Sequence, residues 1–276
     1  MGLHAQHRHV VSALTAPPAS IEPGDLSKIA PPPRSAYFLD IDGTLLEIMP
    51  RPEDVTANEE LRALLMRLSR AAGGALALVS GRRIEDVDRI FAPLVFAAVG
   101  LHGAELRFAD GTRVASSGEA LATVRAAISD FVKARQGLRL EDKGASLAVH
   151  FRQAPQFEQE VVAFLFGLAA KNKLAVQEGK MVAELKESYF DKGKGIAALL
   201  ATPPFLSRTP VFIGDDLTDE SGFRFVNDIG GISVRVSDQS LASAAQFRLE
   251  GPAGVRAELK QLLQSSDWLH GGAHRS

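Results

Sequence analysis

Two acidic residues near position 40 have the spacing of a charged reaction centre. Asp40 and Asp42 follow the apolar run 37–39 and precede Gly43 and Thr44. Alternate residues of a strand point to the same side, so we expect both carboxylates to enter one cavity at the strand end. Two carboxylates this close repel each other unless a cation joins them or one is protonated. Taken alone, the pattern fits a metal site and an ordinary turn rich in Asp and Gly equally well, and the motifs that follow decide between them.

Three further polar motifs each follow an apolar run or open a predicted helix: Ser80-Gly81-Arg82, Lys192, and Asp215 with Asp219. Taken singly, each is explained as a helix cap or a turn. Together, however, they would bring several carboxylates to one place, which requires a hard divalent cation and a lysine. Mg²⁺ prefers oxygen ligands, so carboxylates and a carbonyl suffice to bind it. A hydroxyl and free backbone N–H groups at residues 80–82 suit an anion.

Strands predicted at 37–40, 75–79, 94–99, 210–213 and 232–236 alternate with predicted helices along most of the chain. One helix is expected to begin after Asn58, a good N-cap, and to end near Ala71. The strand at 75–79 is apolar on both faces, as in a central parallel strand. This alternation predicts an α/β fold, whose ligands bind at the carboxyl edge of the sheet.

The middle of the chain departs from that alternation. Residues 109–184 are predicted to fold as helix, two strands, helix and two strands, with short turns between the paired strands, which favours an antiparallel sheet. We therefore predict a small α+β module at 109–184, inserted into an α/β domain made of 34–108 and 185–268. Residues 1–33, rich in Pro and Ala, are predicted to be a flexible extension, and 269–276 a flexible tail.

Composition excludes several classes of function. The 276 residues carry a formal net charge of −2, with no strongly basic surface for a nucleic acid or a membrane. The absence of cysteine excludes disulfides and thiolate chemistry. The longest apolar stretch, Val161 to Ala170, is about half of what crosses a bilayer. We expect a cytoplasmic protein, a monomer by preference, that acts on a small molecule.

The order of these motifs resembles the haloacid dehalogenase superfamily, whose fold is a Rossmann-like parallel-sheet core with an inserted cap. The resemblance implies that Asp40 attacks phosphorus to form an aspartyl phosphate, while Asp42 protonates the leaving oxygen and later deprotonates water. It also implies Mg²⁺ as cofactor, held by Asp40, the backbone carbonyl of Asp42, Asp215 and Asp219. The phosphoryl oxygens would be bound by a further set of residues: Thr44, Ser80, Gly81, Arg82 and Lys192.

Longer motifs are similar to those of the trehalose-6-phosphate phosphatases, a family within this superfamily. They are 40–47, 78–82, 100–105, 150–155 and 212–220, and the similarity runs from about Ala36 to Leu263. The segment 187–191 departs from the Pro-Arg-Gly-Thr pattern that often precedes the catalytic lysine in that family. We still assign that lysine to Lys192, because it opens a helix and is followed by Gly, rather than to Lys186 or Lys194.

By the same resemblance, the inserted module is a cap that closes over the sugar of trehalose 6-phosphate. The implied substrate ligands are Lys143, His150, Arg152, Glu178 and Glu184 from the cap, with His102 and Glu105 from the core. The core motifs do not separate this substrate from sucrose 6-phosphate or glucosylglycerol phosphate, nor a phosphatase from a phosphomutase. A catalytically silent sugar-phosphate sensor is the alternative outside catalysis.

Overall fold

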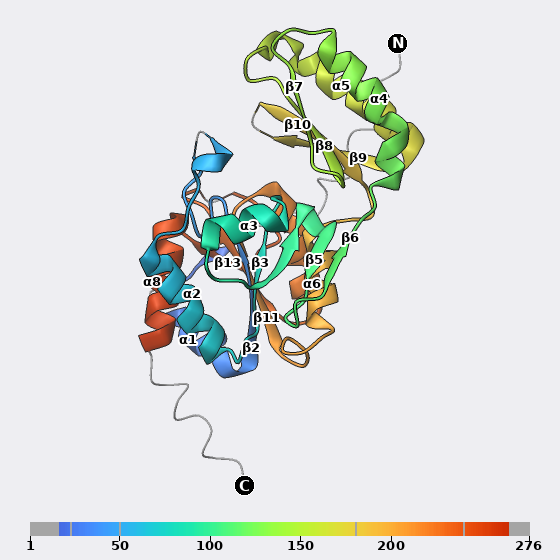
Figure 1. Cartoon of the computed structure of the whole chain (residues 1–276). Helices are drawn as coiled ribbons and strands as arrows, with labels where there is room; N and C mark the ends of the chain where they lie inside the picture. Colours follow the sequence, from blue (N-terminus) through green and yellow to red (C-terminus); the bar gives the residue numbers. More distant parts are fainter. Residues whose placement is uncertain (1–16, 23, 50, 180, 240, 265–276) are drawn as a thin grey trace.

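A nine-stranded sheet with helices on both faces forms the larger lobe of the molecule (Figure 1). The computed structural model describes residues 17–264, apart from Pro23, Pro50, Lys180 and Ser240. The strands lie in this order across the sheet: β1 (Ala19–Ser20), β13 (Phe247–Leu249), β12 (Ile232–Val236), β11 (Thr209–Gly214), β2 (Ser35–Asp40), β3 (Leu76–Val79), β4 (Ala97–Gly100), β5 (Glu105–Arg107) and β6 (Arg113–Ala115). The first seven in that order pair in parallel, whereas β5 and β6 form an antiparallel hairpin at one edge.

Helices cover the two faces of this sheet. On one face α2 (Glu59–Ala71) packs against α8 (Gly251–Gln264), and α8 against α1 (Asp25–Ile29). On the other, α6 (Lys192–Leu200) packs against α7 (Glu220–Asp228). The helix α3 (Ile84–Phe91) lies beside β4 and β5 on the same face as α2, where its Ile90 carbonyl accepts from the Ala57 N–H. Short 3₁₀ turns complete the lobe at η1 (Pro32–Arg34), η2 (Pro52–Asp54), η3 (Leu101–Gly103) and η5 (Leu217–Asp219). The α/β architecture expected from the alternating pattern is confirmed.

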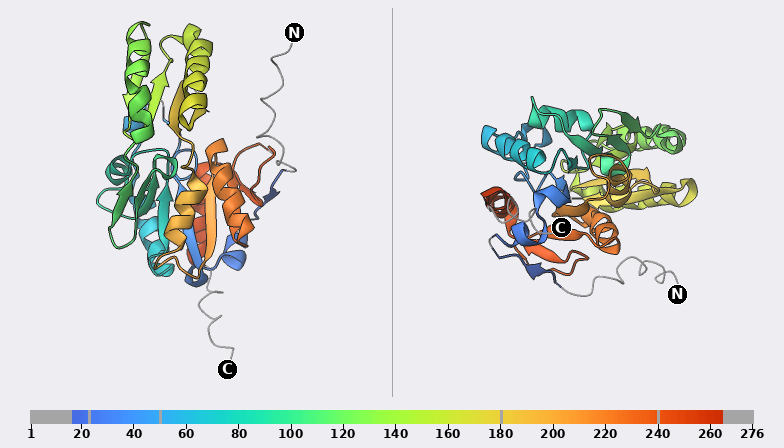
Figure 2. Two further views of the ribbon diagram at one scale, coloured as in Figure 1. Left: turned by 90° about the vertical axis from the view of Figure 1, so that its right-hand side faces the viewer. Right: turned by 90° about the horizontal axis from the view of Figure 1, so that it is seen from below.

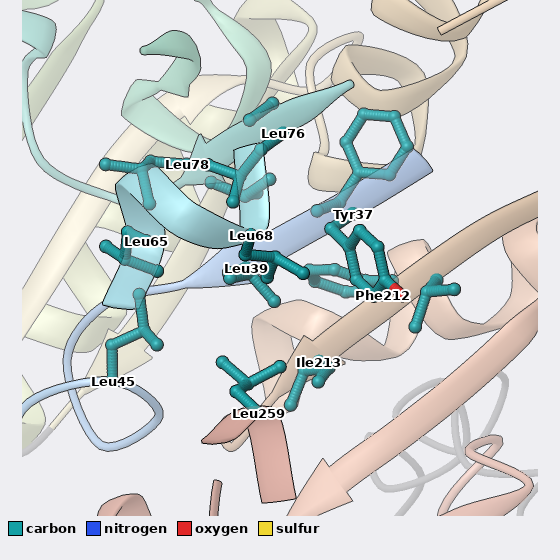
Figure 3. Close-up of a cluster of buried hydrophobic side chains, with 14 of the residues drawn as sticks. Tyr37, Leu39, Leu45, Leu65, Leu68, Leu76, Leu78, Phe212, Ile213 and Leu259 are labelled. Carbon is teal, nitrogen blue, oxygen red and sulfur yellow. The ribbon is translucent and has the colours of Figure 1, made fainter. Parts of the chain in front are cut away.

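The main core lies around β2, the central strand, all of whose residues are buried. Figure 3 shows Leu39 of β2 among side chains from α2, β3, β11 and α8, including Leu65 and Leu259. The helix α2 begins where the sequence predicted, because the Asn58 side chain accepts a hydrogen bond from the Leu61 N–H at 2.9 Å. This packing fixes the carboxyl end of β2, from which Asp40 projects.

A small lobe, residues 119–187, stands above the carboxyl edge of the large sheet (Figure 2). It has a four-stranded antiparallel sheet in the order β7 (Arg139–Asp142), β8 (Ser146–His150), β10 (Val182–Glu187) and β9 (Leu174–Gly179). One face of that sheet is covered by the helices α4 (Glu119–Lys133) and α5 (Glu158–Asn172), and η4 (Pro155–Phe157) precedes α5. The helices and the sheet enclose an apolar core that is separate from the core of the large lobe. The other face is turned toward the large lobe.

The lobe boundaries differ from the predicted range 109–184 at both ends. The strand β6 pairs with β5 and therefore belongs to the large sheet, and β10 continues to Glu187. Asp110 and Gly111, residue types that favour a hairpin turn, lie between β5 and β6, but a three-residue strand with exposed side chains carries no burial signal of its own. No helix in the described part of the chain is long and apolar enough to cross a membrane.

Residues 17–22 and 24–33 are folded, contrary to the prediction of a flexible extension; residues 1–16 and the predicted tail 269–276 lie outside the described residues. The strand β1 pairs with β13, and Leu26 of α1 is fully buried against the core. Glu258 of α8 accepts hydrogen bonds from the Gly24 and Leu26 N–H groups at 2.8 and 2.9 Å. These contacts join segments more than 200 residues apart, so local composition did not reveal them.

This docking predicts unequal effects of two substitutions in α1. Leu26→Ala should lower the free energy of unfolding by about 2–5 kcal/mol, because Leu26 is 0% exposed and its removal leaves a cavity. Ile29→Ala should cost under about 1 kcal/mol, because Ile29 is 39% exposed. Urea unfolding of both variants measures the difference. Equal, small effects would mean that α1 does not belong to the cooperative core.

Candidate active site

Three carboxylates and one ammonium group meet at the carboxyl edge of the large sheet. Asp40 ends β2, Asp215 follows β11, and Asp219 ends η5. One carboxylate oxygen from each lies within 4.8 Å of the others. The Lys192 Nζ lies 2.8 Å from Asp40 Oδ1 and 2.6 Å from Asp219 Oδ1. We call these four residues the charged cluster; its carboxylates have the oxygen donors that a hard divalent cation takes.

Burial governs the electrostatics of the charged cluster. It raises the pKa of Asp40, helped by Asp219 and Asp215 and opposed by Lys192. Burial, together with the Asp219 charge, also raises the pKa of Asp215 from 3.8 to about 6. Burial alone would lower the pKa of Lys192, but attraction to Asp219 and Asp40 outweighs it and raises the pKa. Lys192 therefore stays charged, and the cluster has an excess of negative charge for a cation to offset.

Local geometry explains why Gly43 follows the acidic pair. Gly43 has φ +84°, which side chains rarely adopt, and a Cβ there would lie 2.1 Å from Asp215 Oδ2. Thr44 is fully buried, and its hydroxyl donates to Asp215 Oδ1 at 3.3 Å. The structure therefore places Thr44, predicted as a phosphate ligand, against a carboxylate of the cluster.

Two capping interactions set the remaining members of the cluster. The Asp216 and Asp219 side chains each accept from the other residue's backbone N–H, which forms a capping box around η5, and Asp216 also accepts from the Leu217 N–H. Asp191 caps α6 through the Lys194 N–H, which puts Lys192 at the first helical position.

Of the three lysines considered from the sequence, Lys192 is the one in the cluster. Lys194 instead donates to the Tyr189 carbonyl and lies over the Tyr189 ring, and Lys186 lies on β10.

A cleft of about 390 Å³ lies between the two lobes beside the charged cluster. Most of the residues that line it have polar or charged side chains, and both lobes contribute: Asp42, Pro52, Glu53, Ser80, Gly81, Arg82, Arg83, Asp86, Arg89 and His102 from the large lobe, and Arg139, Glu141, Lys143, Ala148, His150, Val182 and Glu184 from the small lobe. Asp40 pairs with Val79 across β2 and β3, so Ser80 follows directly beside it. The cleft therefore opens next to the cluster.

Asp42 lies in the cleft wall and not among the clustered carboxylates. Its side chain forms an ion pair with Arg82, whose Nε and Nη2 lie 2.6 and 2.7 Å from the two Asp42 oxygens. The Asp42 side chain is therefore paired with Arg82 and is not one of the three carboxylates that lie within 4.8 Å of one another, and the expectation that Asp40 and Asp42 share one cavity stays a prediction. The backbone turns immediately after Asp40, with the Leu45 and Leu46 N–H groups donating to the Ile41 carbonyl.

His102 covers the Ser80-Gly81 turn at the junction of the lobes. It is buried, and a Cβ on Gly81 would lie 2.5 Å from its ring. Burial, with the charges of Lys186, Lys192 and Lys143, lowers the pKa of His102, so the imidazole is neutral. Its Nδ1 has no hydrogen-bond partner in the described structure. Ser80 Oγ accepts from the Arg82 N–H at 3.1 Å.

The register of the small sheet decides which of its residues face the cleft. Glu184 of β10 lies opposite Ala148 of β8, which lies opposite Glu141 of β7, and all three line the cleft. Lys143 Nζ lies 3.1 Å from Glu184 Oε2, and His150 Nε2 lies 2.8 Å from Glu141 Oε2. The hydrogen bond from His150 lowers the pKa of Glu141. Ala148 leaves room between the polar side chains.

Three predicted substrate ligands lie elsewhere. Glu178 pairs with Ala183, so it belongs to the face of the small sheet that α4 and α5 cover. Arg152 is exposed beyond the end of β8 and does not line the cleft. Glu105 accepts from the Ile84 N–H at 2.9 Å and so supplies the carboxylate at the N-terminus of α3.

The sequence reasoning missed Gln177. It pairs with Glu184 across β9 and β10, which places it on the cleft face, and its Nε2 lies 3.3 Å from His102 Nε2. It joins the small lobe to the large one directly above Gly81. Gln177 lies two residues before Gly179 and so shares a face of β9 with it, but only the pairing with β10 shows which face that is. From the sequence, the acidic neighbour Glu178 was the more conspicuous candidate ligand.

Comparison with known proteins agrees with this geometry. The family model described as trehalose-phosphatase matches residues 38–253. The chain is 40% identical over 230 residues to trehalose-6-phosphate phosphatase of Escherichia coli K12, covering 82% of this chain and 86% of that protein. It is 43% identical over 231 residues to a probable trehalose-phosphate phosphatase of Sinorhizobium fredii, covering 82% and 87%.

Solved structures give the same fold. A trehalose-6-phosphate phosphatase related protein superposes with a TM-score of 0.68 at 25% identity, covering 83% of this chain and 96% of that one. The C-terminal domain of Candida albicans trehalose-6-phosphate phosphatase gives a TM-score of 0.77 at 19% identity, covering 91% and 99%. The core has the haloacid dehalogenase fold, as shown by a superfamily phosphatase of Bacteroides thetaiotaomicron with a TM-score of 0.57. With the matched family model spanning most of its length, the chain belongs to the trehalose-phosphatase family.

Proposed function

We propose that this protein hydrolyses trehalose 6-phosphate to trehalose and phosphate through an aspartyl phosphate. The observation that carries the proposal is the charged cluster beside a polar cleft, in a chain 40% identical to a trehalose-6-phosphate phosphatase over most of its length. A buried carboxylate next to a cation is suited to attack phosphorus, and a polar cleft of this size accommodates a disaccharide.

Asp40 is the nucleophile in this proposal. Its carboxylate ends the central strand and is fixed by Lys192 Nζ at 2.8 Å. The Asp40 oxygen bonds to phosphorus while the bond from phosphorus to the sugar oxygen breaks. Lys192 offsets the charge that gathers on the phosphoryl oxygens, and Ser80 with the backbone N–H of Gly81 lies at the adjoining cleft wall to bind them.

Mg²⁺ fits the carboxylates of the cluster. Asp40, Asp215 and Asp219 bring oxygen donors within 4.8 Å of one another. Lys192 neutralises only part of their negative charge. We assign these three residues, with the Asp42 backbone carbonyl, as the residues that hold the ion. When bound, Mg²⁺ supplies positive charge that lets an anionic nucleophile approach an anionic phosphate.

Asp42 serves both half-reactions. It donates a proton to the departing sugar oxygen, and it then accepts one from the water that attacks the aspartyl phosphate and regenerates Asp40. Its position in the cleft wall, two residues from Asp40 and outside the cluster, suits a group that faces the sugar.

The small lobe holds the sugar. Glu184, Lys143 and His150 line the cleft opposite the phosphate end, and the hollow at Ala148 lies between them. Carboxylates, an ammonium group and an imidazole suit a polyol because hydroxyls both donate and accept hydrogen bonds. Closure over the sugar also excludes water from the aspartyl phosphate until the sugar has left.

The substrate assignment is tested by phosphate release, with Mg²⁺, from a panel of phosphate esters. We expect kcat/KM for trehalose 6-phosphate to exceed that for sucrose 6-phosphate, glucose 6-phosphate and mannose 6-phosphate by a hundredfold or more, about 2.7 kcal/mol of transition-state discrimination. A flat profile would leave a phosphatase of another specificity. Silence toward every ester from a folded protein would favour a sugar-phosphate sensor.

The raised pKa of Asp215 predicts pH-dependent stabilisation by Mg²⁺. In the metal-free protein this carboxyl is protonated below about pH 6 and charged above it, so protons compete with the ion at low pH. The increase in Tm on adding Mg²⁺ should be large at pH 7.5 and small at pH 5.

Two Asn variants control this experiment. Asp215→Asn should abolish the Mg²⁺-dependent shift in Tm, whereas Asp216→Asn, which keeps a good helix-capping side chain, should retain it. Equal shifts at both pH values, or a full shift in Asp215→Asn, would contradict the assignment of Asp215 as a metal ligand.

The register of the small sheet predicts opposite outcomes at two neighbouring positions. Gln177→Ala should raise KM for trehalose 6-phosphate by about 3- to 10-fold, because it removes the hydrogen bond to His102 that joins the two lobes beside the cleft. Glu178→Ala, on the helix-covered face, should change KM by less than about twofold. Steady-state kinetics of both variants decides the point, and a larger effect at Glu178 would show that the register is shifted by one residue.

A further inference from the structure

The Arg82 side chain makes contacts that the sequence did not suggest. It was predicted to bind the phosphoryl group, yet its Nε and Nη2 are both directed at Asp42, at 2.6 and 2.7 Å. The pair lies in the cleft wall, with 14% of the Arg82 and 31% of the Asp42 side chain exposed. A paired fork of this kind fixes both the position and the plane of a carboxylate.

Arg82 is itself held from several sides. Its third nitrogen, Nη1, donates to the Pro52 carbonyl at 2.9 Å. Its backbone N–H donates to Ser80 Oγ at 3.1 Å, and its carbonyl accepts from the Leu101 N–H at 2.9 Å. Three guanidinium nitrogens are thus engaged by protein groups, which leaves the guanidinium aligned on Asp42 rather than toward the charged cluster.

The cation beside the nucleophile is already present elsewhere. Lys192 contacts Asp40 and Asp219 directly, and it is buried with them. Arg82 contacts neither of these carboxylates; within the described structure its ion-pair partner is Asp42. Two basic residues therefore have separate partners: Lys192 lies beside the nucleophile Asp40, and Arg82 orients the Asp42 carboxylate in the cleft wall.

We propose that Arg82 is a positioning residue that aims the Asp42 carboxylate at the sugar oxygen leaving phosphorus, and that it does not bind the phosphoryl group. The proposal rests on the function proposed above, in which Asp42 delivers a proton to that oxygen. A free Asp side chain rotates about two bonds, whereas proton delivery requires hydrogen-bond reach in a defined direction. The Arg82 fork removes that freedom before the substrate arrives.

This role makes the effect of Arg82 depend on the leaving group. A sugar alkoxide leaves poorly without a proton, so its release depends on Asp42. The phenolate of p-nitrophenyl phosphate leaves readily without one, so its release does not. A residue that binds the phosphoryl group would affect both esters equally, because both carry the same group.

The test uses Arg82→Lys, which keeps the charge and loses the fork, with Asp42→Asn and the double variant. We expect Arg82→Lys to lower kcat for trehalose 6-phosphate by about 10- to 100-fold. The kcat for p-nitrophenyl phosphate should change by less than about threefold, and inhibition by inorganic phosphate should stay within about twofold. If Arg82 acts through Asp42, the double variant should be no slower than Asp42→Asn alone.

Arg107→Lys is a matched control for structural damage. Arg107 has two nitrogens 2.7 and 2.6 Å from the oxygens of Asp88 and a third donating to the Phe96 carbonyl, the same arrangement as Arg82, outside the cleft. It should leave the ratio of the two kcat values unchanged within about twofold, whatever its effect on Tm.

Two results would overturn the proposal. One is an equal loss on both esters together with weaker phosphate inhibition, which would return Arg82 to the phosphoryl group. The other is a double variant in which the two losses multiply. The wild-type protein separates this test from that of the proposed function, because wild-type turnover of trehalose 6-phosphate establishes the activity whatever the Arg82 variants do.

Discussion

The ion pairs of Lys192 with Asp40 and Asp219 are the constraint on which the site depends. Burying the Asp40 and Asp219 carboxylates without compensation is too costly for a folded chain, so the lysine has to reach both from a rigid element. The fold meets this requirement by pairing β2 directly with β11, and by placing the first residue of α6 over the ends of both. The remaining negative charge is what a divalent cation offsets.

The two lobes contribute chemically different groups to one cleft. The large lobe supplies concentrated, buried charge at the end of the sheet, which suits a small and doubly charged phosphoryl group. The small lobe supplies spaced polar side chains around the hollow at Ala148, which suits hydroxyls in fixed directions. Gln177 and His102 are in contact where these regions meet, so the phosphate end and the sugar end are joined through one hydrogen-bonding pair.

Sequence reasoning succeeded where the signal was local. Apolar runs predicted the central strands, and an N-cap at Asn58 predicted α2, because burial and capping leave their mark within a few residues. The carboxylates of the charged cluster could be grouped because parallel strands present their carboxyl ends at one edge. The two-part architecture was visible from the change in element order.

The predictions that failed concern contacts between residues that are distant in the chain. The face on which Glu178 lies depends on its pairing with Ala183, and a shift of one residue exchanges the two faces. Asp42 and Arg82 are 40 residues apart, so their ion pair could not be read from either motif. The described part of 17–33 folds because Glu258 accepts a hydrogen bond from the Leu26 N–H and because β1 pairs with β13, neither of which its own composition indicates.

Gly103 also constrains how the two lobes can move relative to each other. A Cβ there would lie 2.4 Å from the Asp191 carbonyl, so only glycine allows the backbone entering α6 to lie this close to η3. Asp191 packs against Gly103 and caps α6, so it fixes the backbone at the point where the chain re-enters the large lobe after β10. A rotation of the small lobe about its two connections, 116–118 and 188–190, would therefore leave the ammonium group of Lys192 in place.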